Sequence, residues 1–474
     1  MSISTPHSAR HIAARIILRP RKALPFYGRH PWVLASAIDR VEPIGIHSEH
    51  QLDIDGQPVE LLNDKRKFIA HGIYNSKSRI AVRLYNWNAE EPLDDAFFRR
   101  RLEAAIELRR QIGYEPPQRR VDAAVNRLAH EPPPVDSASS ATRLVFSESD
   151  GLSGLVVDRY GNYLVVQPTS LGMARRIESI VGILQNFIQP RGIVLKLDKA
   201  MAKLEGFESR SRPPGGTSDH DNVSSLLDNV HSENGVVSSA GPAGPAGPTD
   251  GHIWGELPEG TIAIHENNIA YEVDLRVGQK TGLYLDQREN RLAAAKYLQG
   301  RRVLDMFCYT GGFAMSAEKL GGAAEVLAVD GSKTAIAQAQ KNAQLNGLQS
   351  VHFECADGFK YLDELAARGE KFGAVILDPP KFARGRGQAN AALMAYHRLN
   401  KIAVNLLERG GILLTCSCTG GVSREDFLMM LSGVAQKSGR EISVLETRGA
   451  APDHPVSATC LETEYLKCAI CVLR

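Results

Sequence analysis

Four aspartates in the C-terminal half of the chain stand where a nucleoside ligand would need acidic groups. Each follows an apolar stretch that reads as a β-strand, and in chain order they are Asp305, Asp330, Asp357 and Asp378. Parallel strands bring their carboxyl ends to one edge of a sheet, where ligands of α/β folds bind. A single aspartate after a strand is most often a helix N-cap. Four of them beside a glycine-rich loop favour a nucleoside cofactor.

The glycine-rich loop follows the first of these aspartates. Thr310, Gly311 and Gly312 precede a predicted helix that begins near Phe313. Glycines let the backbone approach a ligand closely, and a helix N-terminus favours an anionic group. The loop is not GxGxxG, the turn that seats the pyrophosphate of a dinucleotide. It suits a ligand that has a carboxylate and no phosphate, which favours S-adenosylmethionine (SAM) over NAD.

Two cysteines, Cys416 and Cys418, stand at the end of the fifth predicted strand of this region. Strand alternation directs both to the same face if the strand continues. A thiol at the carboxyl end of a strand, beside a cofactor crevice, is placed to act as a nucleophile. A free cysteine is otherwise usually a small buried hydrophobic residue. We expect that second role for the remaining cysteines, which are Cys308, Cys355, Cys460, Cys468 and Cys471.

Alternating strands and helices would position these residues. The pattern predicts strands at 303–306, 326–329, 351–353, 374–377 and 412–415, with helical stretches between them. This alternation is typical of a parallel, doubly wound sheet. Two further predicted strands, at 443–446 and 465–472, would close it in antiparallel fashion as a seven-stranded sheet. We assign residues 276–474 to this Rossmann-like domain.

The N-terminal part reads as two smaller units. Short strands separated by Gly, Pro and Asp turns predict a small β-domain over residues 12–90. A mixed α/β domain is predicted over residues 91–275, where Asp94 offers an N-cap to its first helix. The clearest local signal in this central domain is a hairpin whose strands lie at 155–159 and 164–167.

One segment of the central domain differs in composition. Residues 208–253 are rich in Ser, Gly, Asn and Pro, and they contain no Phe, Trp or Tyr. Such a segment cannot bury enough apolar surface to offset its ordering entropy. The Gly-Pro-Ala repeat at 241–248 is far too short for a collagen helix. We expect a disordered insertion within a loop, because strand-like segments flank it.

Composition excludes several classes of protein. The chain has 474 residues, and 56 Lys and Arg against 54 Asp and Glu give a net charge of +2, so nucleic-acid binding would need local basic patches. No apolar run is long enough to span a bilayer. The 7 cysteines are odd in number, which argues against a disulfide framework. No paired CxxC motif supports a zinc site, so we expect no metal.

The first residues have two interpretations. Residues 1–38 hold six basic residues and no acidic one, a composition typical of organellar transit peptides. The apolar, β-branched stretch at 14–19 predicts a folded first strand instead. We favour the strand and expect a cytoplasmic protein.

Seven stretches spread over nearly the whole chain carry a family resemblance. They lie at 29–32, 148–154, 280–291, 309–313, 378–382, 417–420 and 453–455. The Rossmann part resembles class I SAM-dependent methyltransferases. More narrowly, the chain resembles the bacterial large-subunit ribosomal RNA methyltransferase I group, which makes 5-methylcytosine in 23S RNA. The resemblance implies an N-terminal PUA-like RNA-binding domain before the central domain.

The resemblance also implies a role for each residue of the crevice. Asp330 would hold the ribose, and Asp357 the amino edge of the adenine. Asp378 would border the cofactor and meet the target base. Cys418 would be the nucleophile, whereas Cys416 has no counterpart in the group. The remaining implied cofactor contacts are Lys280, Gln287, Asp305, Tyr309, Thr310, Gly311 and Gly312.

The implied partner is 23S ribosomal RNA or a precursor of the large ribosomal subunit, and a homodimer is possible. Basic clusters at 65–67, 99–101 and 119–120 would suit phosphate contacts, although each is more often a solvated face. The stretch 196–199 departs from the Arg-rich pattern of the group, which bears on RNA contacts.

Three other functions remain open. A methyltransferase acting on the exocyclic amine of guanine or adenine would use the same Asp-Pro-Pro motif at 378–380, but it would not need Cys418. A non-catalytic RNA-binding assembly factor would have lost the crevice acids. A nicotinamide oxidoreductase is disfavoured by the form of the glycine loop.

Overall fold

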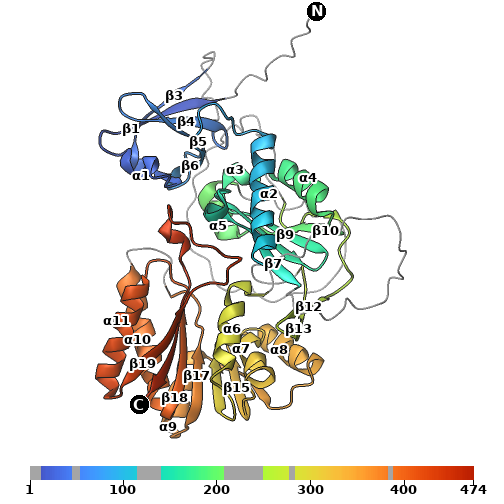
Figure 1. The fold of residues 1–474 in the computed structure, drawn as a ribbon, viewed down its shortest axis with the longest axis vertical. Helices are drawn as coiled ribbons and strands as arrows, with labels where there is room; N and C mark the ends of the chain where they lie inside the picture. The colour runs from blue at the N-terminus through green and yellow to red at the C-terminus, as the bar shows by residue number, and fades with distance from the viewer. Residues whose placement is uncertain (1–11, 45–53, 115–139, 208–248, 277–282, 383–387) are drawn as a thin grey trace, which may run out of the picture.

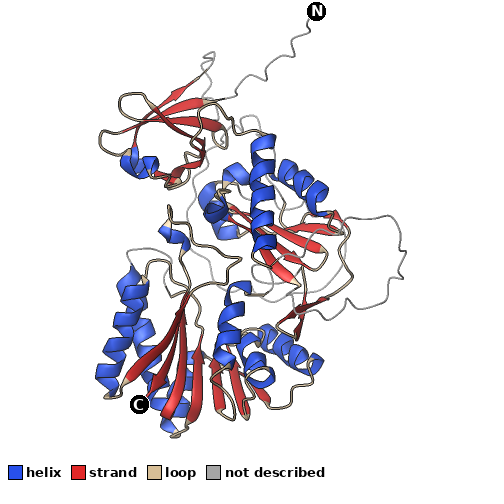
Figure 2. Cartoon of the chain, in the orientation of Figure 1, coloured by secondary structure: helices blue, strands red, loops and turns tan. Residues whose placement is uncertain are grey.

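Three β-sheets organise the chain (Figure 1). The computed structural model describes residues 12–44, 54–114, 140–207, 249–276, 283–382 and 388–474. The described sheets have six, five and seven strands from the N-terminus to the C-terminus, with one separate two-stranded hairpin. Helices flank the central and C-terminal sheets, whereas the N-terminal sheet has one short helix beside it (Figure 2). This arrangement confirms the predicted fold class.

The N-terminal sheet is a small β-structure with strand order β2-β6-β5-β4-β1-β3. Its first strand confirms the strand expected at 14–19, whereas residues 1–11 lie outside the described part of the chain. Side chains such as Ile16 and Leu18 are completely buried and form its core. The elements are β1 (Ala14–Leu18), α1 (Leu24–Tyr27), β2 (Trp32–Leu34), β3 (Ile38–Pro43), β4 (Pro58–Leu62), β5 (Phe68–Tyr74) and β6 (Ile80–Asn86).

The central sheet has the order β11-β10-β9-β8-β7 and packs against α2 and α4 (Figure 1). The predicted hairpin is confirmed, since β8 and β9 pair antiparallel from Leu155–Pro168 to Tyr160–Tyr163. The predicted N-cap is confirmed as well, because Asp94 Oδ1 accepts from Phe97 N at 2.8 Å. The elements are α2 (Asp95–Gln111), β7 (Ala141–Phe146), β8 (Leu155–Tyr160), β9 (Tyr163–Pro168), α3 (Leu171–Ala174), α4 (Ile177–Ile188), β10 (Gly192–Leu195), α5 (Lys199–Glu205) and β11 (Ile253–Gly255).

The low-complexity segment begins and ends at this central sheet. Strand β10 pairs antiparallel with β11, so the chain leaves and re-enters the same sheet on either side of residues 208–248. Those residues lie outside the described part of the chain, and the expectation of disorder stays a prediction. Residues 249–253 are described and lead into β11, so the sequence pattern alone extends the insertion a few residues too far.

The C-terminal sheet has the order β16-β15-β14-β17-β18-β20-β19, and its first five strands in this order run parallel. Strand β20 pairs antiparallel with β18 and with β19, as the sequence predicts. The strands are β14 (Arg302–Met306), β15 (Glu325–Asp330), β16 (Val351–Cys355), β17 (Phe372–Leu377), β18 (Leu407–Ser417), β19 (Ile442–Arg448) and β20 (Lys467–Leu473).

Helices cover both faces of this sheet because its strands are apolar on both sides. One face packs against α9 (Gly358–Ala367), α10 (Ala389–Leu406) and α11 (Arg424–Ser438). The other packs against α6 (Arg288–Ala295), α7 (Gly312–Lys319) and α8 (Lys333–Leu345). The two layers leave the carboxyl edge of the parallel strands between them, where ligands of such sheets bind.

A hairpin of β12 (Ile262–Glu266) and β13 (Ile269–Val273) joins the central and C-terminal parts. It contacts α7 and α8, and its β12 strand contacts β7. Glu266 accepts two hydrogen bonds from Arg291 of α6, both at 2.8 Å, and the two side chains are almost completely buried. Arg288 lies 3.5 Å from the same carboxylate. These ion pairs fix the helix that precedes the first Rossmann strand.

Glu266→Gln is therefore expected to lower the free energy of unfolding by about 3–5 kcal/mol, because it leaves buried guanidinium groups without their counter-charge. Urea denaturation followed by circular dichroism measures the loss. The control is Glu325→Gln, which breaks the exposed pair with Arg302 and should cost less than about 1 kcal/mol. Equal losses of unfolding free energy in the two variants would contradict the stabilising role given to the buried Glu266 ion pairs.

Candidate functional site

A tight turn after β14 forms one wall of the crevice. Phe307 and Tyr309 have φ of 66° and 50°, and Gly311 has φ of 86°. A Cβ at Gly311 would lie 3.2 Å from the Phe353 ring, so glycine is needed there both for its backbone angle and for space. The turn leads into the N-terminus of α7. Close approach of a ligand to its backbone stays a prediction.

Asp305, at the end of β14, is a buried carboxyl that makes no ion pair with any residue the structure describes. It has no exposed surface, and neither oxygen makes a hydrogen bond of normal geometry to any described residue. Burial, and then the nearby Asp378 carboxylate, raise the pKa of Asp305 well above its usual range, and the Ala314 backbone N–H only partly opposes them. An unpaired buried carboxyl at the ligand-binding edge is suited to receive a cation, such as an ammonium group.

The next two acids have different local roles. Asp330 is half-buried at the end of β15, where it accepts from Tyr309 N at 3.0 Å and from Ser332 N at 2.8 Å. It therefore holds the glycine turn in place while remaining at the crevice. Asp357 is exposed and caps α9 by accepting from Lys360 N at 3.0 Å. Its N-cap role does not exclude a ligand, because a carboxylate has further lone pairs.

The two predicted catalytic residues lie next to each other. Asp378 follows β17, Cys418 follows the neighbouring β18, and Cys418 Sγ lies 3.9 Å from the carbonyl oxygen of Pro379. Cys418 is partly exposed. Cys416 has no exposed surface, and burial raises the pKa of its thiol well above the usual range. Only Cys418 of this pair is accessible to a substrate.

The expectation of burial for the remaining cysteines is confirmed for Cys308, Cys460, Cys468 and Cys471, and it is wrong for Cys355. Cys355 is exposed because it ends β16, the edge strand of the sheet, where no further strand covers it.

The segment after residue 282 packs over the glycine turn. The Tyr284 ring meets the Tyr309 ring edge-on at 5.1 Å, and Arg291 donates to the Tyr284 carbonyl at 3.1 Å. Asp286 accepts a hydrogen bond from the Tyr465 hydroxyl. Burial, and then Asp286, raise the pKa of Tyr465 well above its usual range. The segment that contains Tyr284 and Asp286 therefore contacts both the glycine-rich turn and the residues that precede β20.

Three other predicted cofactor contacts are Gln287 and Lys280, from the segment before α6, and Thr310, from the glycine-rich turn. Gln287 is buried, and its Oε1 accepts from Asn290 at 2.6 Å, so its amide faces the interior of the domain. Thr310 is also buried, with its carbonyl oxygen accepting from Asn342. Lys280 lies outside the described residues. Cofactor roles for these three residues stay predictions.

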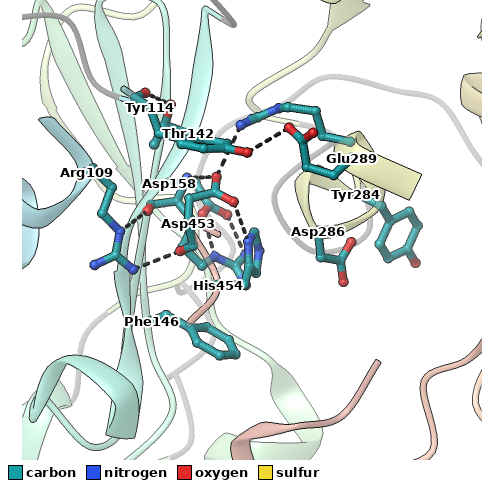
Figure 3. Close-up of polar contacts among 12 residues, drawn as sticks. Arg109, Tyr114, Thr142, Phe146, Asp158, Tyr284, Asp286, Glu289, Asp453 and His454 are labelled. Atoms are coloured by element: carbon teal, nitrogen blue, oxygen red, sulfur yellow. Dashed lines mark hydrogen bonds and ion pairs between the residues drawn. The ribbon is translucent and has the colours of Figure 1, made fainter. Parts of the chain in front are cut away.

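A buried polar network centred on Asp453 holds the central sheet against the crevice (Figure 3). Asp453 accepts from Arg143 N at 3.1 Å and from His454 Nδ1 at 2.9 Å, and its backbone carbonyl accepts from Arg109 at 2.8 Å. Burial alone would raise the pKa of Asp453, but His454 and Arg288 lower it well below its usual range. The motif at 453–455 thus fixes the relative position of two domains.

Sequence reasoning did not single out Tyr284, Tyr465 and Lys467, which lie near Cys418, or Asp286, which accepts from the Tyr465 hydroxyl. One signal was available for Lys467, because a lysine within the otherwise apolar strand β20 is unusual. Tyr284 and Asp286 lie in the 280–291 stretch that carries the family resemblance, but only the fold brings Tyr284 and Tyr465 to Cys418.

The predicted basic clusters are partly engaged in surface ion pairs. Arg66 pairs with Glu42, and Arg100 pairs with Glu91. Residues 119–120 lie outside the described part of the chain. Within the described ranges, no helix is long and apolar enough to cross a membrane.

One group of metal-ligand type occurs among the described residues, formed by His30, Cys460 and Glu462. Hydrogen bonds account for its arrangement. His30 Nδ1 accepts from Trp32 N at 3.3 Å, and His30 Nε2 and Cys460 Sγ lie 3.4 Å and 3.6 Å from Glu462 Oε2. Glu462 thereby links the N-terminal β-structure to the chain before β20.

Comparisons with known proteins agree with this architecture. A family model for S-adenosylmethionine-dependent methyltransferases matches residues 249–462, and one for PUA-like domains matches residues 16–87. The ribosomal RNA large subunit methyltransferase I of Aeromonas hydrophila is 35% identical over 459 residues, which cover 96% of this chain and 98% of the relative. The protein of the same name from Escherichia coli is 33% identical, covering 97% and 99%.

Solved structures show the same fold. A Streptococcus mutans protein named as a SAM-dependent methyltransferase matches with a TM-score of 0.71 at 17% identity, covering 97% of this chain and 99% of that one. The structure of SMU.776 complexed with SAH matches with a TM-score of 0.72, also at 17% identity and with the same coverage. At this identity the likeness shows the fold alone.

The uncompensated burial of Asp305 leads to a prediction about stability. Without ligand, Asp305→Asn should be more stable than the wild type near pH 8, and the difference should shrink as the pH falls toward about 4. The folded pKa of this carboxyl is raised above its unfolded value of about 3.9. The wild type therefore loses stability as the pH rises above that value. Thermal melts of both proteins across this pH range test the sign, and parallel curves would contradict it.

A second prediction concerns the two acids at the ends of β15 and β16. Asp330→Ala and Asp357→Ala should each weaken SAM binding about five- to a hundredfold, because each removes a hydrogen bond worth about 1–3 kcal/mol. Titration calorimetry gives the affinity. Asp94→Ala serves as the control, since it removes an equivalent N-cap from α2 in another domain. Wild-type affinity in both crevice variants would refute the assignment.

Proposed function

Because the chain belongs to the ribosomal RNA large subunit methyltransferase I family and depends on SAM, we propose that it methylates carbon 5 of a cytosine in 23S ribosomal RNA through a covalent Cys418 adduct. The observation that carries the proposal is the position of Cys418. This partly exposed thiol lies 3.9 Å from the backbone of the Asp378-Pro379 turn, at the carboxyl edge of the sheet.

The residues of the crevice fit the cofactor. The unpaired, buried Asp305 carboxyl suits the ammonium group of the methionine moiety. The Tyr309–Gly312 turn leads into the N-terminus of α7, which suits a carboxylate. Asp330 stands at the next strand end, where a carboxylate pairs with ribose hydroxyls. When bound, SAM supplies an electrophilic methyl group.

Carbon 5 of a cytosine is too weak a nucleophile to take a methyl group from SAM directly. A nucleophile of the protein must first add to the ring and activate it. Attack of the Cys418 thiolate on carbon 6 forms a carbon–sulfur bond and moves the ring's π electrons toward carbon 5 and nitrogen 3. Asp378 holds a proton at nitrogen 3 while charge develops there. Carbon 5 then takes the methyl group. Loss of the carbon 5 proton to a base restores the double bond and releases the thiolate.

The accessible thiol distinguishes this reaction from its main alternative. Methylation of an exocyclic amine of guanine or adenine uses the amine's own lone pair and needs no cysteine. An Asp-Pro-Pro turn serves both reactions, but only the carbon 5 reaction requires Cys418 beside it. We therefore place the exocyclic-amine reaction second.

The substrate proposed here is 23S ribosomal RNA or a precursor of the large subunit, which would be met in the cytoplasm. Support comes from the names of the relatives and from the PUA-like domain at residues 16–87. The possible homodimer stays a prediction that no contact in the structure supports.

The two strand-end cysteines provide the decisive test. Cys418→Ala should abolish methyl transfer to 23S RNA and leave SAM affinity unchanged, because the thiol acts on the base. Cys416→Ala is the matched control: it removes a buried thiol two residues away and should retain most activity. Transfer of tritiated methyl groups and calorimetric SAM titration measure the two properties.

Trapping the covalent complex between the enzyme and RNA tests directly whether Cys418 is the nucleophile. Wild-type enzyme should form a denaturant-stable complex with RNA that contains 5-fluorocytosine, because fluorine at carbon 5 blocks the proton loss that releases the thiolate. Peptide mass mapping should locate the RNA on Cys418. An adduct on Cys416, or a Cys418→Ala variant that still methylates, would sink the proposal, and the latter would favour the exocyclic-amine reaction.

A further inference from the structure

Lys467 is a buried lysine beside the proposed nucleophile. It is the first residue of β20 and pairs directly with Ser417, the last residue of β18. Its side chain is 1% exposed, and its Nζ donates to the carbonyl oxygens of Thr419 and Tyr465, both at 2.8 Å. The Lys467 ammonium is therefore bound to the carbonyl oxygen of Thr419, the residue that directly follows Cys418.

No carboxylate compensates this buried ammonium group. Among the described residues, no acid lies within ion-pair distance of Lys467, and the nearby Glu464 is held by Arg424 at 2.6 Å. Burying a cation with only backbone carbonyls as partners is costly. Arg424 and Lys381 add further positive charge nearby, and among the neighbouring acidic groups the Cys418 thiol acts most strongly on Lys467. An anion at Cys418 is the charge that this environment favours.

We propose that Lys467 is a positioning residue that holds the turn after Cys418 through the Thr419 carbonyl and stabilises the Cys418 thiolate by its positive charge. A neighbouring lysine is an established way to make a thiol ionise at lower pH. The inference rests on the proposed function, in which this thiolate attacks the base.

Lys467 can stabilise the thiolate only at a pH low enough for its own amine to stay protonated. Burial, opposed by Cys418 and Glu464, lowers the pKa of Lys467 to about 8. The ammonium is therefore present below that pH and is lost above it, whereas the thiolate forms as the pH rises. The methyl-transfer rate should pass through a maximum between these two titrations. The other titratable and charged groups near the two residues are Tyr284, Tyr396, Tyr465, Asp378, Lys381, Arg424 and Glu464.

The test measures the reactivity of the thiol rather than methylation. The full-length protein is alkylated with iodoacetamide across about pH 5–9, the range in which protein thiols titrate, and peptide mass mapping follows each cysteine separately. The exposed Cys355 provides an internal reference, because it lies at the far edge strand and has no lysine contact among the described residues. In the wild type, Cys418 should reach half-maximal reactivity about one pH unit or more below Cys355.

Two variants separate the charge of Lys467 from its hydrogen bonds. Lys467→Gln keeps a donor for the carbonyl oxygens but removes the charge, and it should slow alkylation of Cys418 at pH 7 about tenfold or more. Lys467→Arg keeps the charge and should restore most of this reactivity. Alkylation of Cys355 should be the same in all three proteins. In Lys467→Gln, the acidic limb of the kcat profile should move to higher pH while SAM affinity stays unchanged.

These measurements can overturn the proposed role of Lys467 in more than one way. A wild-type Cys418 that titrates with Cys355 would overturn the proposal even if neither variant folds. A folded Lys467→Gln protein with an unchanged Cys418 profile would also overturn it. If Cys418→Ala still methylates RNA but the alkylation profile shifts as expected, the proposed function fails and the effect of Lys467 on the thiol stands.

Discussion

Strand β18 is hydrogen-bonded on one side to the parallel strand β17 and on the other to the antiparallel strand β20, and the candidate catalytic centre depends on this double pairing. The pairing with β17 places Cys418 beside the Asp378-Pro379 turn. The pairing with β20 brings Lys467 to Ser417 and its ammonium group to the Thr419 carbonyl. A shift of β20 by one residue would turn the lysine to the opposite face of the sheet. Cys418, Asp378 and Lys467 are thus brought together by three neighbouring, hydrogen-bonded strands.

The same edge of the sheet carries two buried charges that the protein itself does not compensate. Asp305 has no hydrogen bond of normal geometry to the described residues, and Lys467 has only backbone carbonyls. Both are expensive in free energy, and both lie at the crevice. By contrast, the buried charges of Arg291 and Glu266 compensate each other. An uncompensated buried charge is expected at a site where binding, rather than folding, supplies the missing partner.

Buried ion pairs and hydrogen bonds join the three sheets. Arg83 of β6 lies 3.0 Å from Glu205 of the central part and 3.3 Å from Glu148. Arg109 of the central part donates to the Asp453 carbonyl oxygen, and the Arg143 backbone N–H donates to the Asp453 carboxylate. Breaking the Arg83 pairs would leave a buried charge without its partner, and breaking the bonds to Asp453 would leave buried polar groups unsatisfied. They hold the PUA-like domain at a set position relative to the crevice, so that an RNA bound to one would be presented to the other in a defined orientation.

The sequence is sufficient to predict the alternating strands of the C-terminal sheet and the central hairpin. It also predicts the strand-end positions of Asp305, Asp330, Asp357, Asp378 and Cys418. Local patterns suffice for these features because strand periodicity and turn chemistry act over a few residues. The packing of the fold was needed to show that Cys418 is accessible and Cys416 buried, that Cys355 is exposed on an edge strand, and that Gln287 faces the interior. The fold also brings Tyr284, Tyr465 and Lys467 near the Cys418 thiol. Burial and electrostatic environment depend on which distant segments pack together, and this information is not contained in the spacing of residues along one strand.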